Sequence, residues 1–196
     1  MSYLFAPEAL DTPSFTLRCY MPGDGPMLTE AVNASTDHLS PWMPWASPNQ
    51  TEALSEQLVR QFRGRYLLAQ DFVLAIVAPE SSAGPARLLG GTGFHLRGGG
   101  LEAREAEIGM WIRADAAGRG LGTEVLGMMI AWGFDAWPWQ RLEWRCDGRN
   151  VASIRTAQKA GMVQEAVLRQ VWAPEKASRR DTFIFAALKA EHEESP

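Results

Sequence analysis

A glycine-rich segment, Ala117-Gly118-Arg119-Gly120-Leu121-Gly122-Thr123, is the part of the sequence best suited to chemistry. Glycines at alternate positions let the main chain approach a ligand closely and turn several amide groups the same way. A helix is predicted from Thr123, and its N-terminus would add about half a positive charge. The segment therefore predicts a site for phosphate oxygens, with a simple tight turn as the alternative. It is not a Walker loop, because no Gly-Lys-Ser/Thr follows, and its GxGxG spacing differs from the dinucleotide fingerprint.

The elements on either side of this segment must position it. Residues Ala106 to Ile112 alternate as a strand, Thr123 to Ala136 form an amphipathic helix closed by Trp137-Pro138, and Arg141 to Asp147 alternate again. A crossover from one strand through a helix to the next strand implies a parallel pair. We therefore expect the glycine-rich segment at the end of one of two parallel strands.

The rest of the chain supplies further strands and helices without a repeat or a linker. Further strands are predicted at Phe15 to Tyr20, Phe72 to Ala78, Leu88 to Leu96, Glu165 to Trp172 and Asp181 to Leu188, and further helices from near Met27, from Thr51 to Tyr66 with Leu54, Leu58 and Phe62 on one face, and from Asn150 to Ala160, stopped by Gly161. Two prolines and two tryptophans predict a structured loop at residues 38–45. The order predicts one α+β domain with a mixed sheet flanked by helices. Its expected parts are an N-terminal extension (1–13), the domain (14–189) and an acidic tail (190–196).

Composition excludes several classes of protein. With 196 residues, 46% hydrophobic and 21% charged, the chain is predicted to be one soluble globular domain. The net charge of −4 provides no positive field for nucleic acid or an anionic membrane. Two cysteines and three scattered histidines indicate neither a disulfide scaffold nor a structural metal, and favour the reducing cytoplasm. The longest apolar stretch, Val125 to Phe134, is about half a membrane span.

Several motifs, in order along the chain, resemble one enzyme family. They are Leu17-Arg18, the Leu-x-x-Trp segment Leu39 to Trp42, Glu107-Ile108-Gly109, the Gly-x-Gly-x-Gly-Thr-Glu loop Gly118 to Glu124, Asn150-x-x-Ser153, and Lys159-x-Gly161. This pattern resembles the GNAT acyltransferase superfamily and, more narrowly, its RimJ/RimL-type N-acetyltransferases. The resemblance extends from about Phe15 to Leu188.

The resemblance implies acetyl-CoA as co-substrate, no metal, and a splayed sheet in which the strand ending at Ile112 parts from the strand beginning near Arg141. Pantetheine would bond to the main chain of Met110, Trp111 and Ile112. The diphosphate would bind the loop residues Gly118, Arg119, Gly120, Leu121, Gly122 and Thr123, and the guanidinium of Arg119 could add a charge-assisted contact. The chain departs from the superfamily at Ala117, where a polar residue is frequent.

The same resemblance assigns catalytic roles. A main-chain amide of Met110 or Trp111 would stabilise the oxyanion. Many relatives protonate the leaving thiolate with a tyrosine at the position of Ala157, so Ser153 is the candidate acid here, one turn after Asn150, whose side chain would contact pantetheine. The alternative for this pair is structural, with Asn150 as the helix N-cap.

The general base is the least specified group. Glu107 is the leading candidate, acting directly or through water, and Glu105 stays open because Gly109 could introduce a bulge. An α-amine with a pKa of about 8 is roughly one tenth neutral at pH 7, whereas a lysine with a pKa of about 10.4 is almost fully protonated. Because no residue is clearly marked as the general base, the sequence favours an α-amine as acceptor. His95 is interpreted as structural.

Three tryptophans, Trp42, Trp45 and Trp172, either wall an apolar acceptor cleft or fill the core. The predicted reaction is direct, sequential acetyl transfer from acetyl-CoA to a primary amine, first of all the N-terminal α-amine of a protein or peptide. Two alternatives stay open, which are a small amine acceptor such as a polyamine, amino acid or aminoglycoside, and an acyl-CoA sensor without turnover. No nucleic-acid or membrane partner is expected, and the sequence leaves a homodimer open.

Overall fold

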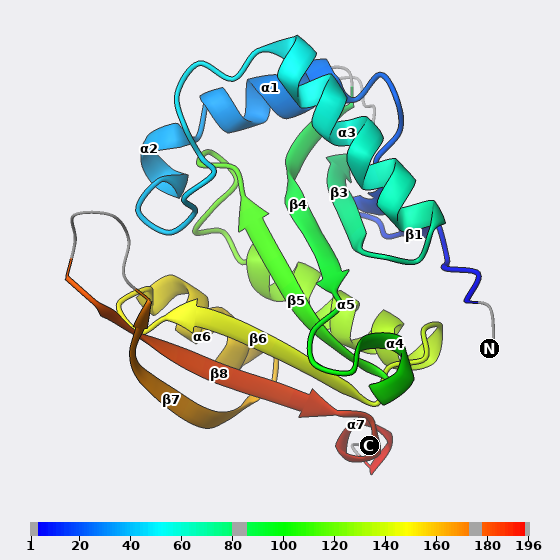
Figure 1. Cartoon of the computed structure of the whole chain (residues 1–196), viewed down its shortest axis with the longest axis vertical. Helices are drawn as coiled ribbons and strands as arrows, with labels where there is room; N and C mark the ends of the chain where they lie inside the picture. Colours follow the sequence, from blue (N-terminus) through cyan, green and yellow to red (C-terminus); the bar gives the residue numbers. More distant parts are fainter. Residues whose placement is uncertain (1–3, 80–85, 173–177, 195–196) are drawn as a thin grey trace. The chain divides into compact units, whose positions relative to one another are not determined.

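The computed structural model describes residues 4–79, 86–172 and 178–194. In these residues one eight-stranded sheet has the order β1-β2-β3-β4-β5-β6-β8-β7 (Figure 1). The chain forms two compact units: unit 1 holds residues 1–95 and 110–119, and unit 2 holds residues 96–109 and 120–196. Strand β5 (Glu105–Ile112) contributes its first half to unit 2 and its second half to unit 1.

Unit 1 is an antiparallel array with helices packed on it. Its elements are β1 (Ala9–Asp11), β2 (Thr16–Cys19), α1 (Gly25–Asn33), α2 (Thr36–Leu39), α3 (Glu52–Leu67), β3 (Phe72–Ala78) and β4 (Arg87–His95). Strands β1 to β4 pair in sequence order as an antiparallel meander. Helices α1 and α3 pack against each other and against β4 and β3 (Figure 1). The buried cluster between them includes Tyr20, Leu28, Val32, Val59 and Leu88.

The apolar face predicted for α3 is only partly correct, because Phe62 packs against the core cluster but the two leucines do not. Leu54 and Leu58 are 53% and 37% exposed, whereas the buried residues of this helix are Ser55, Val59 and Tyr66. The physical reason is a polar residue on the buried face: the Ser55 hydroxyl is satisfied by Thr29 Oγ1 of α1 at 2.8 Å. Burial of Ser55 therefore carries little desolvation cost, and a pattern that counts only apolar residues selects the neighbouring face.

Unit 2 contains the parallel pair. Its elements are α4 (Gly100–Ala103), the start of β5, α5 (Leu121–Asp135), β6 (Arg141–Asp147), α6 (Val151–Lys159), β7 (Val163–Trp172), β8 (Arg180–Leu188) and α7 (Lys189–Glu194). Strands β5 and β6 pair in parallel over Glu105–Glu107 and Arg141–Glu143, as the crossover predicts. Strand β8 pairs antiparallel with both β6 and β7, which confirms the terminal hairpin.

The α+β class with an open mixed sheet flanked by helices is confirmed. The predicted inward face of β6 is also confirmed, because Leu142, Trp144 and Cys146 are 0%, 6% and 9% exposed. Elements β1, α4 and α7 were not predicted; β1 lies in the expected N-terminal extension, and α7 covers much of the expected acidic tail. In the predicted loop at residues 38–45, α2 takes the first two residues. None of the described helices is long and apolar enough to span a bilayer.

A close main-chain contact in unit 1 leaves no room for a side chain at one glycine of β4. A Cβ atom placed on Gly90 would lie 2.1 Å from the carbonyl oxygen of Trp111. Because that oxygen belongs to a neighbouring main chain, it cannot move away as a flexible side chain would. We expect Gly90→Ala to lower the free energy of unfolding by about 1–3 kcal/mol, the usual cost of overpacking, measured by urea unfolding.

The matched control is Gly64→Ala in α3, where a Cβ would meet no atom within 4 Å. This variant should be as stable as the native chain or more stable by up to about 1 kcal/mol, because alanine favours helix. A Gly90→Ala protein as stable as the Gly64→Ala protein would show that β4 and β5 do not approach each other as described.

Candidate active site

The glycine-rich loop has a backbone that needs its glycines. After β5, Ala116 and Ala117 donate main-chain hydrogen bonds to the carbonyl of Arg113 at 3.1 Å, which closes one turn. Gly118 and Gly120 then adopt φ of +75° and +92°, a region that side chains disfavour. Gly120 is the N-cap of α5, and its carbonyl accepts hydrogen bonds from the amides of Thr123 and Glu124.

The amides of residues 118–122 have no acceptor within the described part of the chain. Two of them, those of Leu121 and Gly122, belong to the first turn of α5, where the helix dipole is positive. Residues 118–120 are exposed, so the amides are accessible from solvent. Unpaired amides at a helix N-terminus favour anions, so five consecutive donors at the start of this 15-residue helix suit the role predicted for the loop, which stays a prediction. The positive φ values confirm the demand for glycine at positions 118 and 120.

A buried arginine that sequence reasoning missed anchors the start of this loop. The Arg113 side chain is 6% exposed and forms a bidentate pair with Glu30 of α1, with both N–O distances at 2.8 Å. Its Nε donates to Asp115 Oδ1 at 2.7 Å, and its Nη1 donates to the carbonyl of Leu88 at 3.1 Å. The hydrogen bonds that Arg113 donates to Glu30 raise the pKa of Arg113 despite burial. Its guanidinium therefore stays charged and holds the turn before Gly118 to α1 and β4.

Asn150 and Ser153 are brought together as the sequence predicts, in the geometry of a helix cap. Asn150 is the N-cap of α6, and its Oδ1 accepts the amide proton of Ser153 at 3.1 Å. The hydroxyl of Ser153 also accepts a hydrogen bond from Trp144 Nε1 at 3.0 Å. The cap engages the side-chain oxygen of Asn150 and not its NH2 group, so the structural role is observed and the binding role stays a prediction.

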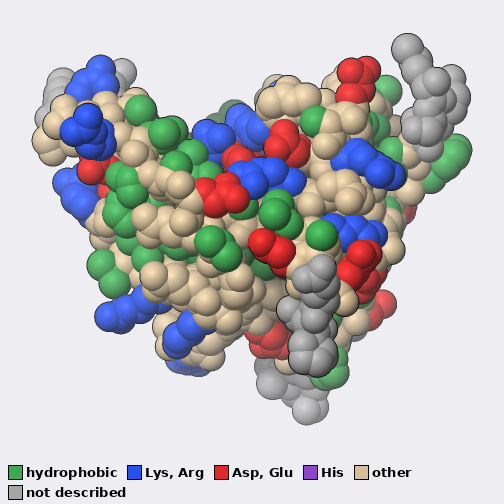
Figure 2. Space-filling model, turned by 90° about the horizontal axis from the view of Figure 1, so that it is seen from below, with side chains coloured by type: hydrophobic (Ala, Val, Ile, Leu, Met, Phe, Trp, Pro, Cys, Tyr) green, Lys and Arg blue, Asp and Glu red, His purple; other side chains and the backbone are tan. Residues whose placement is uncertain are grey.

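The carboxylate of Glu107 lies among arginines. Its Oε2 accepts from Arg97 Nε at 3.0 Å and lies 3.6 Å from Arg145 Nε, and the side chain is 15% exposed. Glu105, the alternative base, lies 3.4 Å from Arg141 Nε. Both candidates are thus parts of ion pairs in unit 2. On the face drawn in Figure 2, basic and acidic side chains are likewise intermixed rather than separated by sign.

Arg141 is the centre of this charged network. It pairs with Glu165 at 2.5 Å and with Glu143 at 2.7 Å. The hydrogen bond from Arg141 lowers the pKa of Glu165. Burial acts to raise the pKa of Glu143, but hydrogen bonds from Arg141 and Arg145 outweigh it and leave this pKa lowered. The network therefore depends on ionised carboxylates.

The second half of β5, which the resemblance assigns to pantetheine, belongs to unit 1. Met110, Trp111 and Ile112 are partly buried. The register between β5 and β6 covers only Glu105 to Glu107. Trp111 packs on the core of unit 1, and its carbonyl faces Gly90 of β4.

The structure describes the surroundings of two of the three tryptophans predicted to contact the acceptor. Trp45 is 46% exposed and its ring lies 5.8 Å from that of Trp111 in an edge-on contact. Trp42 is partly buried in the same loop. Trp172 ends β7, and its side chain lies outside the described residues. An exposed indole edge beside Trp111 was not predicted, because the two rings are distant in sequence.

The histidine and cysteine residues considered in the sequence analysis are placed as follows by the structure. His95 Nδ1 lies 2.8 Å from Asp71 Oδ1, in accord with its structural interpretation. Cys19 and Cys146 are buried free thiols. In residues 4–79, 86–172 and 178–194 no three His, Cys, Asp or Glu side chains are grouped to hold a metal ion.

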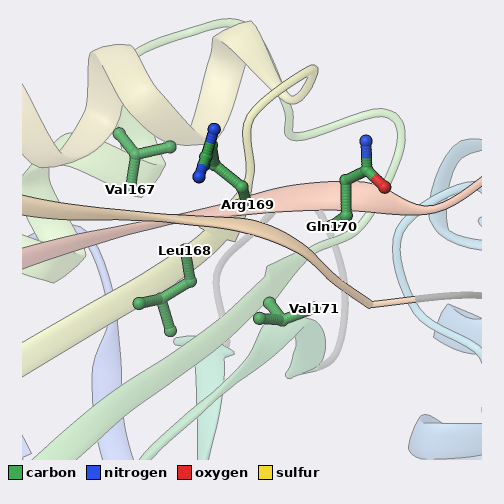
Figure 3. Close-up of a pocket in the computed structure, with 5 residues that line it drawn as sticks. All are labelled: Val167, Leu168, Arg169, Gln170 and Val171. Atoms are coloured by element: carbon green, nitrogen blue, oxygen red, sulfur yellow. The ribbon is translucent and has the colours of Figure 1, made fainter.

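A groove of about 580 Å³ that the sequence did not reveal follows β7. Val167 and Arg169 point to one side of the strand, and Leu168 and Val171 to the other, while Gln170 breaks the alternation and projects on the side of Arg169 (Figure 3). Gln170 has a φ of +54°, and the register with β8 shifts between Leu168 and Trp172. Its amide donates to Asp181 Oδ1 at 2.9 Å, so the bulge is held by a specific contact.

Comparison with known proteins gives one family match and many similar structures. A family model described as an acetyltransferase (GNAT) domain matches residues 14–163. No curated protein sequence matches the chain. The structure is similar to that of the RimL ribosomal L7/L12 alpha-N-protein acetyltransferase in complex with coenzyme A, at 16% identity over 92% of this chain and 98% of that chain, with a TM-score of 0.81.

Two further similar structures are acetyltransferases with different names. The microcin C7 self-immunity acetyltransferase MccE, in complex with acetyl-CoA and AMP, is 19% identical over 90% of this chain and 93% of that chain, with a TM-score of 0.77. The ribosomal-protein-S5-alanine acetyltransferase from Vibrio fischeri is 14% identical over 92% and 96%, also with a TM-score of 0.77. At these identities the likeness establishes the fold.

The ion pairs of Glu143 predict how stability depends on pH. Because its pKa is lowered in the folded state, the unfolded chain takes up the proton first. The stabilisation is therefore present above the unfolded pKa of about 4.3 and is lost as the pH falls through the lower folded value. We expect Glu143→Gln to lose less unfolding free energy than the native chain between pH 6 and pH 3, measured by urea unfolding.

The control is Glu102→Gln in α4, an exposed carboxylate of the same unit. It should retain the native loss of stability with falling pH. Equal slopes for the native chain and Glu143→Gln would mean that Glu143 is not held ionised by Arg141 and Arg145.

Proposed function

Because the chain belongs to the GNAT acetyltransferase family, we propose that it moves the acetyl group of acetyl-CoA directly to a primary amine, foremost the N-terminal α-amine of a protein or peptide. The observation that carries the proposal is the set of free amides at residues 118–122. They suit the diphosphate of coenzyme A, with the N-terminus of α5 adding positive potential. Arg119, exposed in the same loop, can add a charge-assisted contact.

The thioester end is proposed to lie along Met110 to Ile112, with a main-chain amide of Met110 or Trp111 facing the oxyanion. Asn150 would contact pantetheine through its side-chain NH2 group. The attacking amine forms a bond to the carbonyl carbon, the C–S bond breaks, and its electron pair leaves with the sulfur. Ser153 is the proposed donor to that thiolate, since its hydroxyl lies at the first turn of α6.

Glu107 is the proposed base, directly or through water. Its ion pairs with Arg97 and Arg145 hold the carboxylate in place, but they also occupy Oε2. An α-amine needs little help, because roughly one tenth of it is neutral at pH 7. The ion-paired state of Glu107 therefore supports an α-amine as acceptor more than a lysine side chain.

A protein or peptide acceptor of the RimJ/RimL type is supported by two observations. Two of the similar structures are named as ribosomal-protein acetyltransferases, one of them as an alpha-N-protein enzyme. In addition, β7 ends the strand order and exposes Val167 and Val171 along its groove. An extended peptide can bind such an edge through main-chain hydrogen bonds and side-chain contacts. Trp42, Trp45 and Trp172 are proposed to contact the acceptor's first residues.

A small-amine acceptor is the second candidate, favoured by the likeness to MccE, which was solved with acetyl-CoA and AMP. An acidic chain, with a net charge of −4, suits cationic acceptors of either kind. Because the two buried cysteines are free thiols, which suits a reducing compartment, the cytoplasm is the proposed location.

Release of free thiol from acetyl-CoA separates these functions. We expect release with peptides that carry a free α-amine and none with the same peptides after N-terminal blocking, even when they contain lysine. Release with polyamines, amino acids or aminoglycosides alone would assign the small-amine function. Binding of acetyl-CoA without release in the whole panel would contradict catalysis and indicate a sensor.

The loop is tested separately by Gly120→Ala. At φ of +92° an alanine is strained, so the loop must shift and its amides turn away from the diphosphate. We expect the dissociation constant for acetyl-CoA to rise at least about tenfold, the equivalent of 1.4 kcal/mol, measured by calorimetry.

Gly127→Ala in the same helix is the control, because a Cβ there meets no atom within 4 Å and the residue is helical. It should bind acetyl-CoA within twofold of the native chain. Unchanged affinity in Gly120→Ala would remove the loop from the binding site.

A further inference from the structure

A tryptophan that none of the assigned roles uses is bonded to the proposed proton donor. Trp144 Nε1 donates to Ser153 Oγ at 3.0 Å, and Trp144 is only 6% exposed. Trp144 lies on the inward face of β6, and Ser153 lies nine residues later in the first turn of α6. The contact therefore joins the strand to the residue that the proposed mechanism needs.

The hydrogen-bonding capacity of the indole determines the direction of this contact. An indole N–H can only donate, so the serine oxygen must be the acceptor. The hydroxyl has one proton of its own, which then points away from Trp144. The main chain of Ser153 is fixed as well, because its amide is bonded to Asn150 Oδ1 at 3.1 Å. Ser153 is thus held as a hydrogen-bond donor with a restricted direction.

Ser153 also bears on the pKa of a buried thiol, that of Cys146. Burial raises the pKa of Cys146, and a hydrogen bond from Ser153 acts in the opposite direction, to lower that pKa. Cys146 follows Trp144 by two residues on the same inward face of β6.

We propose that Trp144 is a positioning residue, which orients the Ser153 hydroxyl as donor to the departing sulfur of coenzyme A. The inference rests on the proposed acetyl transfer. As the C–S bond breaks, the sulfur takes the electron pair, Ser153 donates its hydrogen bond, and the thiolate gains the proton through the hydroxyl from solvent. The amine gives one proton to solvent or to the base, so protons balance. The indole polarises the hydroxyl and removes the rotamers that point elsewhere.

A double-mutant cycle tests this role. Trp144→Phe retains an aromatic ring but removes the N–H, and it should lower kcat about 3–10-fold, the rate equivalent of one neutral hydrogen bond. The KM for acetyl-CoA should stay within about threefold. Ser153→Ala should lower kcat at least as much, and on that background Trp144→Phe should change kcat by less than twofold.

Trp132→Phe is the matched control, because Trp132 of α5 is 7% exposed and loses the same atoms. It should leave kcat within twofold, while thermal unfolding of all variants shows whether they are folded at the assay temperature. Equal effects of Trp144→Phe with and without Ser153, or an unchanged kcat in Trp144→Phe, would overturn the inference.

An NMR experiment keeps the inference testable even if acetyl transfer fails. The chain contains eight tryptophans, so 15N-tryptophan labelling gives a small set of indole signals, and the one lost in Trp144→Phe identifies Trp144. Ser153→Ala should shift this signal and leave that of Trp132 in place. A native chain without thiol release would reject the proposed function alone, whereas an unshifted Trp144 signal would reject the contact.

Discussion

The structure around the site depends on main-chain amides that the fold leaves without acceptors. Backbone N–H groups are normally paired, and the first turn of a helix is the regular exception. Here the exception is extended backwards by Gly118 and Gly120, whose left-handed backbone prevents the chain from entering a regular turn. Because residues 118–120 are exposed, water can satisfy these donors until an anion replaces it. In the ligand-free protein, the free-energy cost of leaving these amides without a protein acceptor is therefore small.

An open loop binds well only if it does not have to be ordered on binding, and Arg113 provides that order. Its guanidinium is buried, but every bond it makes goes to a charged or carbonyl oxygen on α1, β4 or the turn itself. Such full satisfaction is what makes a buried cation tolerable. The turn before Gly118 is thus fixed before any ligand arrives, which reduces the entropy lost on binding.

Local patterns in the sequence predicted those features whose cause is local. Strands β3 and β6 were predicted to the residue because local sequence defines them, a continuous apolar run in β3 and a period of two in β6. The loop glycines were identified because a left-handed φ is a property of a single residue. The face of α3 was only partly predicted, because the burial of Ser55 depends on Thr29, a residue of another helix.

Groups whose behaviour depends on distant partners were not predictable in the same way. The sequence singled out Glu107 as a strand carboxylate, but its two arginines come from the residues after β4 and from β6. The Arg113 anchor and the Trp144 contact with Ser153 depend likewise on tertiary pairing. Single residues of ordinary type carry no sign of such partners, so only the fold could reveal them.

The environments of Glu107 and Ser153 bear on whether the protein has to assist mainly the attack of the amine or the departure of the thiolate. An amine attacks only when neutral, and a lysine side chain with a pKa of about 10.4 would be neutral in only a few molecules per ten thousand at pH 7. Such an acceptor would need an effective base, and the carboxylate proposed for this role, Glu107, is already ion-paired with Arg97. On the leaving-group side the hydroxyl of Ser153 is fixed through both its amide and its oxygen. With the roles proposed for Ser153 and Glu107, the site would be rigid toward the thiolate and weakly equipped toward the amine. Such a site would suit the proposed acceptor, a terminal α-amine, because that amine arrives partly neutral.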